Sequence, residues 1–315
     1  MAWSVAQLPS MVGKVALITG ANCGLGLESS LRLIEKGALV VMACRDVEKA
    51  KPALEQVQAA AKEGGQAQLL QLDLADLSSV RQFCENFLAT GMKCNILMCN
   101  AGVMHCPYAH TKDGIEMQFG TNHVGHFLLT NLLLDRIKES QPARIVVLSS
   151  SLHTDCPPGG IRFDDLNWAQ GKEYTIQKGY GHSKFANIAF AFELAKRLEK
   201  TQVFVNAVHP GFVDTNLTRH RETNFIVKLV VRFLKWKSAM NVHDGALTQL
   251  FVAGDPSIET NNVRARFFVP IATEGEVKVP EGCDMADQQA KLWKLSEKLV
   301  KQEFDVQGTG RTLSQ

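Results

Sequence analysis

The fold is decided by Val15-Ala-Leu-Ile-Thr-Gly-Ala-Asn-Cys-Gly-Leu-Gly26, in which an apolar run leads into a glycine-rich turn. The run is typical of a buried strand, and apolar residues at helical spacing follow the turn. Glycines at positions 20, 24 and 26 lack the Cβ atoms that would keep a pyrophosphate away from the backbone. The amides at the start of the helix favour its negative charge. This stretch therefore predicts a dinucleotide-binding turn; the alternative is a tight turn that holds no ligand.

Apolar runs of strand length recur along the chain, and helical stretches separate nearly all of them. The runs span 15–19, 38–43, 68–72, 96–99, 144–148, 203–208 and 266–269. Short apolar strands that alternate with helices predict βαβ units and a parallel sheet covered on both faces. We therefore expect an α/β, doubly wound Rossmann fold with a sheet of about seven strands and a ligand site at its carboxyl edge.

Composition predicts one large domain. The chain has 315 residues, 45% of them hydrophobic, and no linker, repeat or low-complexity run divides it. We expect a single domain over 1–315, with a core of about 13–220 and 240–302. The formal charge of +2, from 34 basic and 32 acidic residues, argues against nucleic acid as a partner, because nucleic-acid binding requires a strongly basic face.

Eight cysteines are scattered along the chain without the C-x-x-C spacing of a zinc site. The N-terminal residues show no secretory pattern of a basic region followed by an apolar one. Reduced thiols and an intracellular protein are therefore expected, and no metal site. The cysteines occupy positions 23, 44, 84, 94, 99, 106, 156 and 283.

A phenol and an ammonium are paired in Tyr180-Gly-His-Ser-Lys184, because residues four apart lie on the same face of a helix. A nearby cation favours the phenolate, so we expect Lys184 to lower the pKa of Tyr180 toward the range useful for proton transfer. The alternative is a half-buried helix with an ordinary surface lysine.

Four motifs in a fixed order resemble the short-chain dehydrogenase/reductase family. They are Thr19-Gly-Ala-Asn-Cys-Gly-Leu-Gly26, Asn100-Ala-Gly102, Ser149-Ser-Ser151 after a strand, and Tyr180-Gly-His-Ser-Lys184. The glycine spacing is that of this family and not the G-x-G-x-x-G of other Rossmann proteins. Further stretches are similar to the retinol-dehydrogenase and WW-domain-oxidoreductase branch, although the chain has no WW domain. These are Ala43-Cys-Arg-Asp46, His182-Ser-Lys-Phe-Ala-Asn187 and His209-Pro-Gly211; Asn122 lies in Thr121-Asn-His-Val-Gly-His-Phe127.

The resemblance implies roles in catalysis for four residues. Tyr180 is the general acid/base, and Lys184 lowers its pKa and holds the nicotinamide ribose. Ser150, the middle one of three serines, holds the substrate oxygen. Asn122 supports a water-mediated proton path to Lys184; as a lone asparagine it reads as a helix-kink or capping residue.

The resemblance also implies which residues bind a nicotinamide dinucleotide. The nicotinamide end meets Tyr180 and Lys184, and Asp73 contacts the adenine, with a helix N-cap as its alternative role. The remaining binding residues are Gly20, Asn22, Cys23, Gly24, Leu25, Gly26, Arg45, Leu74, Asn100, Ala101, Gly102, Pro210, Gly211, Val213 and Thr215.

The end of the second strand predicts which dinucleotide is preferred. An acidic side chain there would bind an adenosine ribose, whereas a basic one would hold a 2′-phosphate. The chain has Cys44 where NAD-preferring members of the family have an aspartate, and Arg45 offers a fork of donors suited to phosphate. NADP(H) is therefore expected; the alternative is a solvated surface arginine.

The segment 212–240 corresponds to the substrate lid of the family, and it contains a basic stripe at helical spacing over 224–237. Such a helix is too short and too charged to span a bilayer. We expect it to cover a lipophilic substrate. The alternatives are peripheral contact with an anionic membrane surface, or packing against the body or a subunit partner.

Together these features predict an NADP(H)-dependent oxidoreductase that interconverts a lipophilic alcohol and its aldehyde or ketone, with retinoid- or steroid-like substrates first. A cytoplasmic location, with peripheral membrane contact as the alternative, and a monomer or homodimer are expected. The alternative functions are a protochlorophyllide-reductase-like enzyme and a catalytically silent NADP(H)-binding scaffold.

Overall fold

The computed structural model describes residues 2–169, 173–213 and 240–307. The predicted helix over 224–237, most of the predicted lid and Thr215 lie outside these residues.

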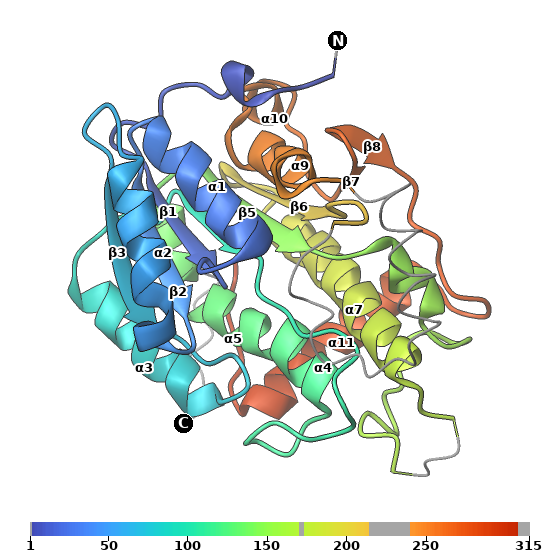
Figure 1. Cartoon of the computed structure of the whole chain (residues 1–315). Helices are drawn as coiled ribbons and strands as arrows, with labels where there is room; N and C mark the ends of the chain where they lie inside the picture. Colours follow the sequence, from blue (N-terminus) through green and yellow to red (C-terminus); the bar gives the residue numbers. More distant parts are fainter. Residues whose placement is uncertain (1, 170–172, 214–239, 308–315) are drawn as a thin grey trace, which may run out of the picture.

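A single twisted sheet forms the centre of the described structure (Figure 1). Its strand order is β3-β2-β1-β4-β5-β6-β7-β8, and each pair is parallel except the last, β7 with β8. This arrangement confirms the predicted α/β, doubly wound class. The strands are β1 (Val15–Thr19), β2 (Leu39–Cys44), β3 (Gln66–Gln71), β4 (Ile96–Cys99), β5 (Ala143–Leu148), β6 (Val203–Val208), β7 (Phe267–Val269) and β8 (Thr273–Gly275).

The expected seven strands were one too few, because β8 was missed. This strand has the sequence Thr-Glu-Gly and its first two residues are exposed, so it carries no apolar run to reveal it. It exists because a short turn brings it back against β7, where Val269 pairs with Thr273. Tertiary pairing, rather than local sequence, therefore defines this edge of the sheet.

Helices cover both faces of the sheet (Figure 1). They are α1 (Gly24–Glu35), α2 (Val47–Ala59), α3 (Leu77–Ala89), α4 (Met117–Phe119), α5 (Gly125–Leu132), α6 (Leu134–Glu139), α7 (Ile176–Arg197), α9 (Val242–Gly254), α10 (Ser257–Thr260) and α11 (Met285–Val300). Two 3₁₀ turns, η1 (Val5–Gln7) and η3 (Ser151–Asp155), and one π-helical turn, η2 (Gly120–Val124), complete the described elements.

Alternation along the strands creates two apolar cores, one on each face. Leu17 and Leu97 point to the face covered by α3, α5, α7 and α11, whereas Ile18 and Met98 point to the face covered by α1, α2 and α9. Because both faces are buried, the strands read as continuous apolar runs, which is why the sequence revealed them.

Helix α11 packs along α7, the long central helix. Its Trp293 is buried against Phe127 and Phe190, and the Arg197 guanidinium lies 4.0 Å from the Trp293 ring centroid. Helix α7 is thereby enclosed between the sheet and α11, and most of its residues are buried. This enclosure fixes the helix that carries Tyr180 and Lys184.

The strand order places the ligand crevice. From β1 the chain proceeds outward through β2 and β3, and it then returns to β4 on the other side of β1. Loops therefore diverge at the carboxyl ends of β1 and β4, which is where open α/β sheets bind ligands.

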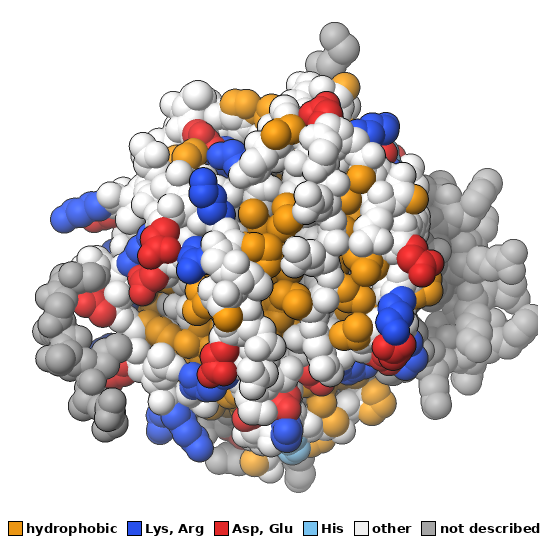
Figure 2. Space-filling view, turned by 90° about the vertical axis from the view of Figure 1, so that its left-hand side faces the viewer, with side chains coloured by type: hydrophobic (Ala, Val, Ile, Leu, Met, Phe, Trp, Pro, Cys, Tyr) orange, Lys and Arg blue, Asp and Glu red, His pale blue; other side chains and the backbone are white. Residues whose placement is uncertain are grey.

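Charge is distributed without a dominant sign on the side of the molecule where β3 and α2 lie. Figure 2 shows acidic and basic side chains interspersed on this side, in keeping with the formal charge of +2. Among the described residues, none of the helices combines the length and the apolar character needed to cross a bilayer.

Candidate active site

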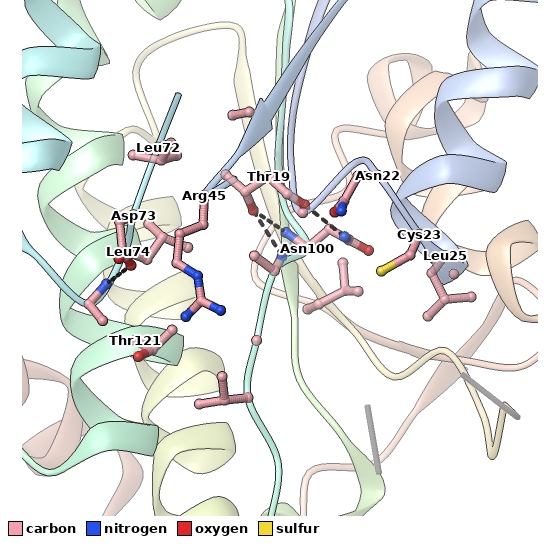
Figure 3. A pocket seen from close by; sticks show the side chains of 18 of the residues that line it. Thr19, Asn22, Cys23, Leu25, Arg45, Leu72, Asp73, Leu74, Asn100 and Thr121 are labelled. Carbon is pink, nitrogen blue, oxygen red and sulfur yellow. Dashed lines mark hydrogen bonds between the residues drawn. The ribbon is translucent and has the colours of Figure 1, made fainter. Parts of the chain in front are cut away.

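A cavity of about 330 Å³ opens at the carboxyl ends of the central strands (Figure 3). It is lined by the glycine turn after β1, the ends of β2, β3 and β4, and the middle of α7. Most of the residues that the sequence assigned to cofactor binding meet here. Those that line the cavity are Gly20, Asn22, Cys23, Gly24, Leu25, Arg45, Asp73, Leu74, Asn100, Ala101, Gly102, Tyr180, Lys184 and Pro210.

Gly26 lies beneath the turn rather than in the cavity wall. A Cβ atom on Gly26 would lie 2.4 Å from the Gly20 carbonyl oxygen and 2.6 Å from the side-chain Nδ2 of Asn100. Gly20 itself has a φ of +65° and would place a Cβ 3.0 Å from that of Ala101. Close backbone packing therefore requires glycine at both positions. As a result, no side chain at these positions covers the backbone of the turn at the N-terminus of α1. These features fit the pyrophosphate of a dinucleotide.

Arg45 extends into the cavity from the end of β2 (Figure 3). Its guanidinium forms no ion pair with any residue that the structure describes. The neighbouring Cys44 points the other way: its thiol is buried, it receives hydrogen bonds from the amides of Ala21 and Asn22, and burial raises its pKa to about 11. A ligand beside β2 therefore meets the side chain of Arg45 and not that of Cys44.

Asp73 lines the cavity but does not cap α3. Its carboxylate accepts a hydrogen bond from the Ala75 amide, whereas Asp76 caps the helix by accepting from the amides of Ser78 and Ser79. The N-cap alternative for Asp73 is therefore wrong. Its side chain lies beside Leu74 at the end of β3, across the cavity from Asn100 (Figure 3).

The side chains of Tyr180 and Ser150 hydrogen-bond each other, although they come from different elements. Tyr180 is on α7, and Ser150 caps the 3₁₀ turn that follows β5, where its hydroxyl accepts from the Leu152 amide. Ser149 points elsewhere, because its hydroxyl donates to the Lys184 carbonyl at 2.7 Å. Among the three serines, Ser150 is thus the one placed beside the phenol.

The pKa of Tyr180 is raised in this structure, contrary to the expectation of a lowered one. Burial raises the pKa of Tyr180, and the hydrogen bond from Ser150 opposes that shift only partly. The Lys184 ammonium lies over the Tyr180 ring, 5.5 Å from its centroid. With Tyr180 only 4% exposed, desolvation of the phenolate is the largest cause of this shift. The phenol is therefore protonated at neutral pH.

Burial also acts on Lys184, whose pKa it lowers to about 8. The ammonium donates to the Leu148 carbonyl at 3.1 Å, and that carbonyl also accepts from the Asn187 amide at 2.9 Å. The fold thus buries the Lys184 amine where its neutral form is favoured over the ammonium. Such an arrangement is common at functional sites.

Replacing Lys184 with methionine is expected to raise the free energy of unfolding at neutral pH by about 1–3 kcal/mol, because it removes a buried charge without orphaning Leu148. The pKa of Lys184 falls from 10.5 to about 8 on folding, so the unfolded chain binds more protons between these values. The stability of the wild type should therefore rise with pH through that window relative to the variant. Denaturant unfolding of both proteins at neutral and alkaline pH measures the difference; a less stable variant at neutral pH would contradict it.

Asn122 is buried in the π-helical turn η2 and is not among the residues that line the cavity. Its Oδ1 accepts from the Val103 amide at 2.8 Å, and its Nδ2 donates to the Val103 carbonyl and to Ser183. A Cβ on Gly102 would lie 3.1 Å from the Oδ1 of Asn122 and 3.6 Å from the Nζ of Lys184. Asn122 therefore fixes the segment after β4 against α7.

In the segment after β6, Pro210 lines the cavity, whereas Gly211 and Val213 do not. Gly211 has a φ of +89°, and its Cβ position is taken by Met240. Val213 packs against Gly245 of α9.

Two buried histidines, His153 and His126, contact residues of the site. Neither was predicted from the sequence to have a role. His153 contacts the Ser150 carbonyl through Nδ1 at 2.7 Å and accepts from the Lys278 amide. His126 contacts the Thr19 hydroxyl, which in turn accepts from the Asn100 amide. The spacing in the sequence could have indicated both, because His153 follows Ser150 and His126 follows Asn122 by about one helical turn.

The sequence and the fold are similar to those of known proteins. A family model described as short chain dehydrogenase matches residues 14–161 and 169–224. Retinol dehydrogenase 14 of Mus musculus is 44% identical over 299 residues, which cover 92% of this chain and 86% of that protein. Retinol dehydrogenase 12 of Mus musculus is 53% identical over 215 residues, or 68% of this chain and 65% of that protein.

Among solved structures, a putative uncharacterized protein from Mycobacterium paratuberculosis is similar over nearly the whole chain. The two share 36% identity with a TM-score of 0.75, covering 96% of this chain and 99% of the other.

Proposed function

Because the chain belongs to the short-chain dehydrogenase family and is an oxidoreductase of its retinol-dehydrogenase-like branch, we propose that it reduces lipophilic aldehydes or ketones with NADPH. The observation that carries this proposal is that Tyr180, which hydrogen-bonds Ser150, lines the same cavity as the glycine turn. One cavity therefore contains both a proton donor and a turn suited to bind a dinucleotide.

Arg45 supports the choice of NADPH over NADH. Its guanidinium is directed into the cavity and is free to form bidentate hydrogen bonds with a 2′-phosphate. Lys49, which also lines the cavity, adds positive charge there, although Asp46 pairs with it at 2.7 Å. The adenosine end would thus be held by Arg45 and Asn100, next to the pyrophosphate at the glycine turn.

The bound cofactor supplies the hydride, and the residues of the chain handle the proton and the charge. Tyr180, protonated at neutral pH, gives its proton to the carbonyl oxygen. Ser150 donates a hydrogen bond to the same oxygen and so stabilises the developing negative charge. Lys184 stabilises the tyrosinate left behind. The raised pKa of Tyr180 keeps the phenol protonated at neutral pH, so the proton that reduction requires is present on Tyr180.

The substrate is proposed to be lipophilic because the relatives at 44% and 53% identity are named retinol dehydrogenases. Val103 and Met117 add apolar surface to the cavity that Tyr180 lines. Neither a pigment-reducing enzyme nor a silent scaffold gains support from these relatives.

Purified protein is expected to consume NADPH with at least one carbonyl compound from a panel of retinal, steroid ketones and small aldehydes. The rate should fall as the pH rises through about 8, because Lys184 then loses the charge that stabilises the tyrosinate. Loss of reduced-nicotinamide absorbance follows the reaction. Absence of turnover on the whole panel with both NADPH and NADH would refute the proposal.

A further inference from the structure

His126 links the glycine turn to the turn that carries Asn122. It is 1% exposed, on α5. Its Nδ1 lies 2.9 Å from the Asn122 carbonyl oxygen, and its Nε2 lies 2.9 Å from the Thr19 hydroxyl. One imidazole thus touches two segments that are more than a hundred residues apart in the sequence.

The protons of this network can be assigned from its partners. A carbonyl oxygen only accepts, so Nδ1 of His126 carries the proton and Nε2 is an acceptor. The Thr19 hydroxyl then donates to Nε2 at 2.9 Å, which is shorter than its 3.4 Å contact with the Met98 carbonyl oxygen. Its two lone pairs are left to accept from the amides of Asn100, at 3.0 Å, and Ala101, at 2.9 Å. Every donor and acceptor in the chain of contacts is satisfied.

The last members of this network form part of the cavity wall. Thr19, Asn100 and Ala101 all line it. The Asn100 side chain also donates to the Thr19 carbonyl at 2.7 Å, which closes the strand end of β4 onto that of β1 (Figure 3).

We propose that His126 is a positioning residue for the dinucleotide site: its Nδ1–H tautomer orients the Thr19 hydroxyl, which holds the Asn100 and Ala101 amides at the cavity wall. This role rests on the proposed function.

The neutral imidazole that this role requires is also the form that the fold favours. Burial lowers the pKa of His126 to about 4, and the charge of Lys184 acts in the same direction. A protonated His126 would direct an N–H at a hydroxyl whose lone pairs are already taken. The network therefore persists only with neutral His126.

The first test reads the tautomer on the wild-type chain. Nitrogen-15 NMR of histidine-labelled protein, with His126 assigned from the signal lost in His126→Gln, should show a neutral Nδ1–H ring at neutral pH. An Nε2–H or cationic ring would overturn the proposal, and this result does not depend on whether any variant folds.

The second test measures NADPH dissociation constants by titration. Thr19→Val and His126→Phe should each weaken binding about tenfold, because each leaves a buried polar group unpaired. Their effects should not add in the double variant, since they break one network. Thr19→Ser, which keeps the hydroxyl, should bind within about twofold of the wild type.

His123→Gln is the matched control. His123 is also fully buried, in the adjoining turn η2, but its Nε2 contacts Ser296 of α11 at 2.8 Å. This variant should lose thermal stability and keep its NADPH affinity. Unchanged affinity in Thr19→Val and His126→Phe would overturn the role of His126 and leave the proposed function intact. A wild-type chain that binds neither NADPH nor NADH would overturn both.

Discussion

Replacing Tyr180 with phenylalanine is expected to lower kcat for carbonyl reduction by about 10³-fold while leaving the NADPH dissociation constant within about twofold. The phenyl ring keeps the contact with the Lys184 ammonium, so packing in the wall of the cavity is retained. Only the hydroxyl that hydrogen-bonds Ser150 is lost, and with it the proton donor. Single-turnover kinetics and cofactor titration measure the two quantities separately.

Tyr174→Phe is a suitable control for Tyr180→Phe. Tyr174 is half-buried, and its hydroxyl donates to the Glu116 carboxylate at 3.1 Å, away from the residues that line the cavity. Loss of this hydroxyl should reduce stability rather than kcat. If Tyr180→Phe retained wild-type kcat, Tyr180 would not be the proton donor and the proposed mechanism would fail.

Replacing Arg45 with aspartate is expected to shift the NADPH-to-NADH ratio of kcat/KM by about 10³-fold toward NADH. Loss of charge-assisted hydrogen bonds to the 2′-phosphate weakens NADPH binding by about 1.5–3 kcal/mol, and a carboxylate at the same place repels the phosphate. The carboxylate also offers an acceptor to the ribose hydroxyls of NADH. Steady-state kinetics with both cofactors gives the ratio.

Lys51→Asp provides the same change of net charge on α2 without touching the cavity. Lys51 is exposed and pairs with Glu48 on the same helix. Its replacement should leave the ratio unchanged, because salt screens an exposed charge at that distance. An Arg45→Asp enzyme with the wild-type ratio would remove Arg45 from cofactor selection.

The sheet could be predicted because strands that are buried on both faces have continuous apolar sequences. Strands β1, β4 and β6 match these runs residue for residue. Strand β3 was placed two residues late, since it lies at the edge of the sheet and Gln66 and Gln68 are exposed there. Edge strands lack the pattern that burial imposes.

The site was predictable where chemistry and spacing coincide within one element. The glycine turn and the pair Tyr180 and Lys184 are local patterns, and the structure brings both to one cavity. The predicted direction of the pKa shift of Tyr180 was wrong, because the shift depends on how deeply the fold buries the phenol. The contact of His126 with Thr19 spans 107 residues and leaves no local trace.

The enclosure of α7 by α11 also determines when the site can form. Chains are made from the N-terminus, so α7 emerges well before α11 does. Until α11 is synthesised, Phe190 and the rest of the outer side of α7 lack the cover that Trp293 gives them. The nascent chain therefore contains Tyr180 and Lys184 before the helix that carries them can be enclosed.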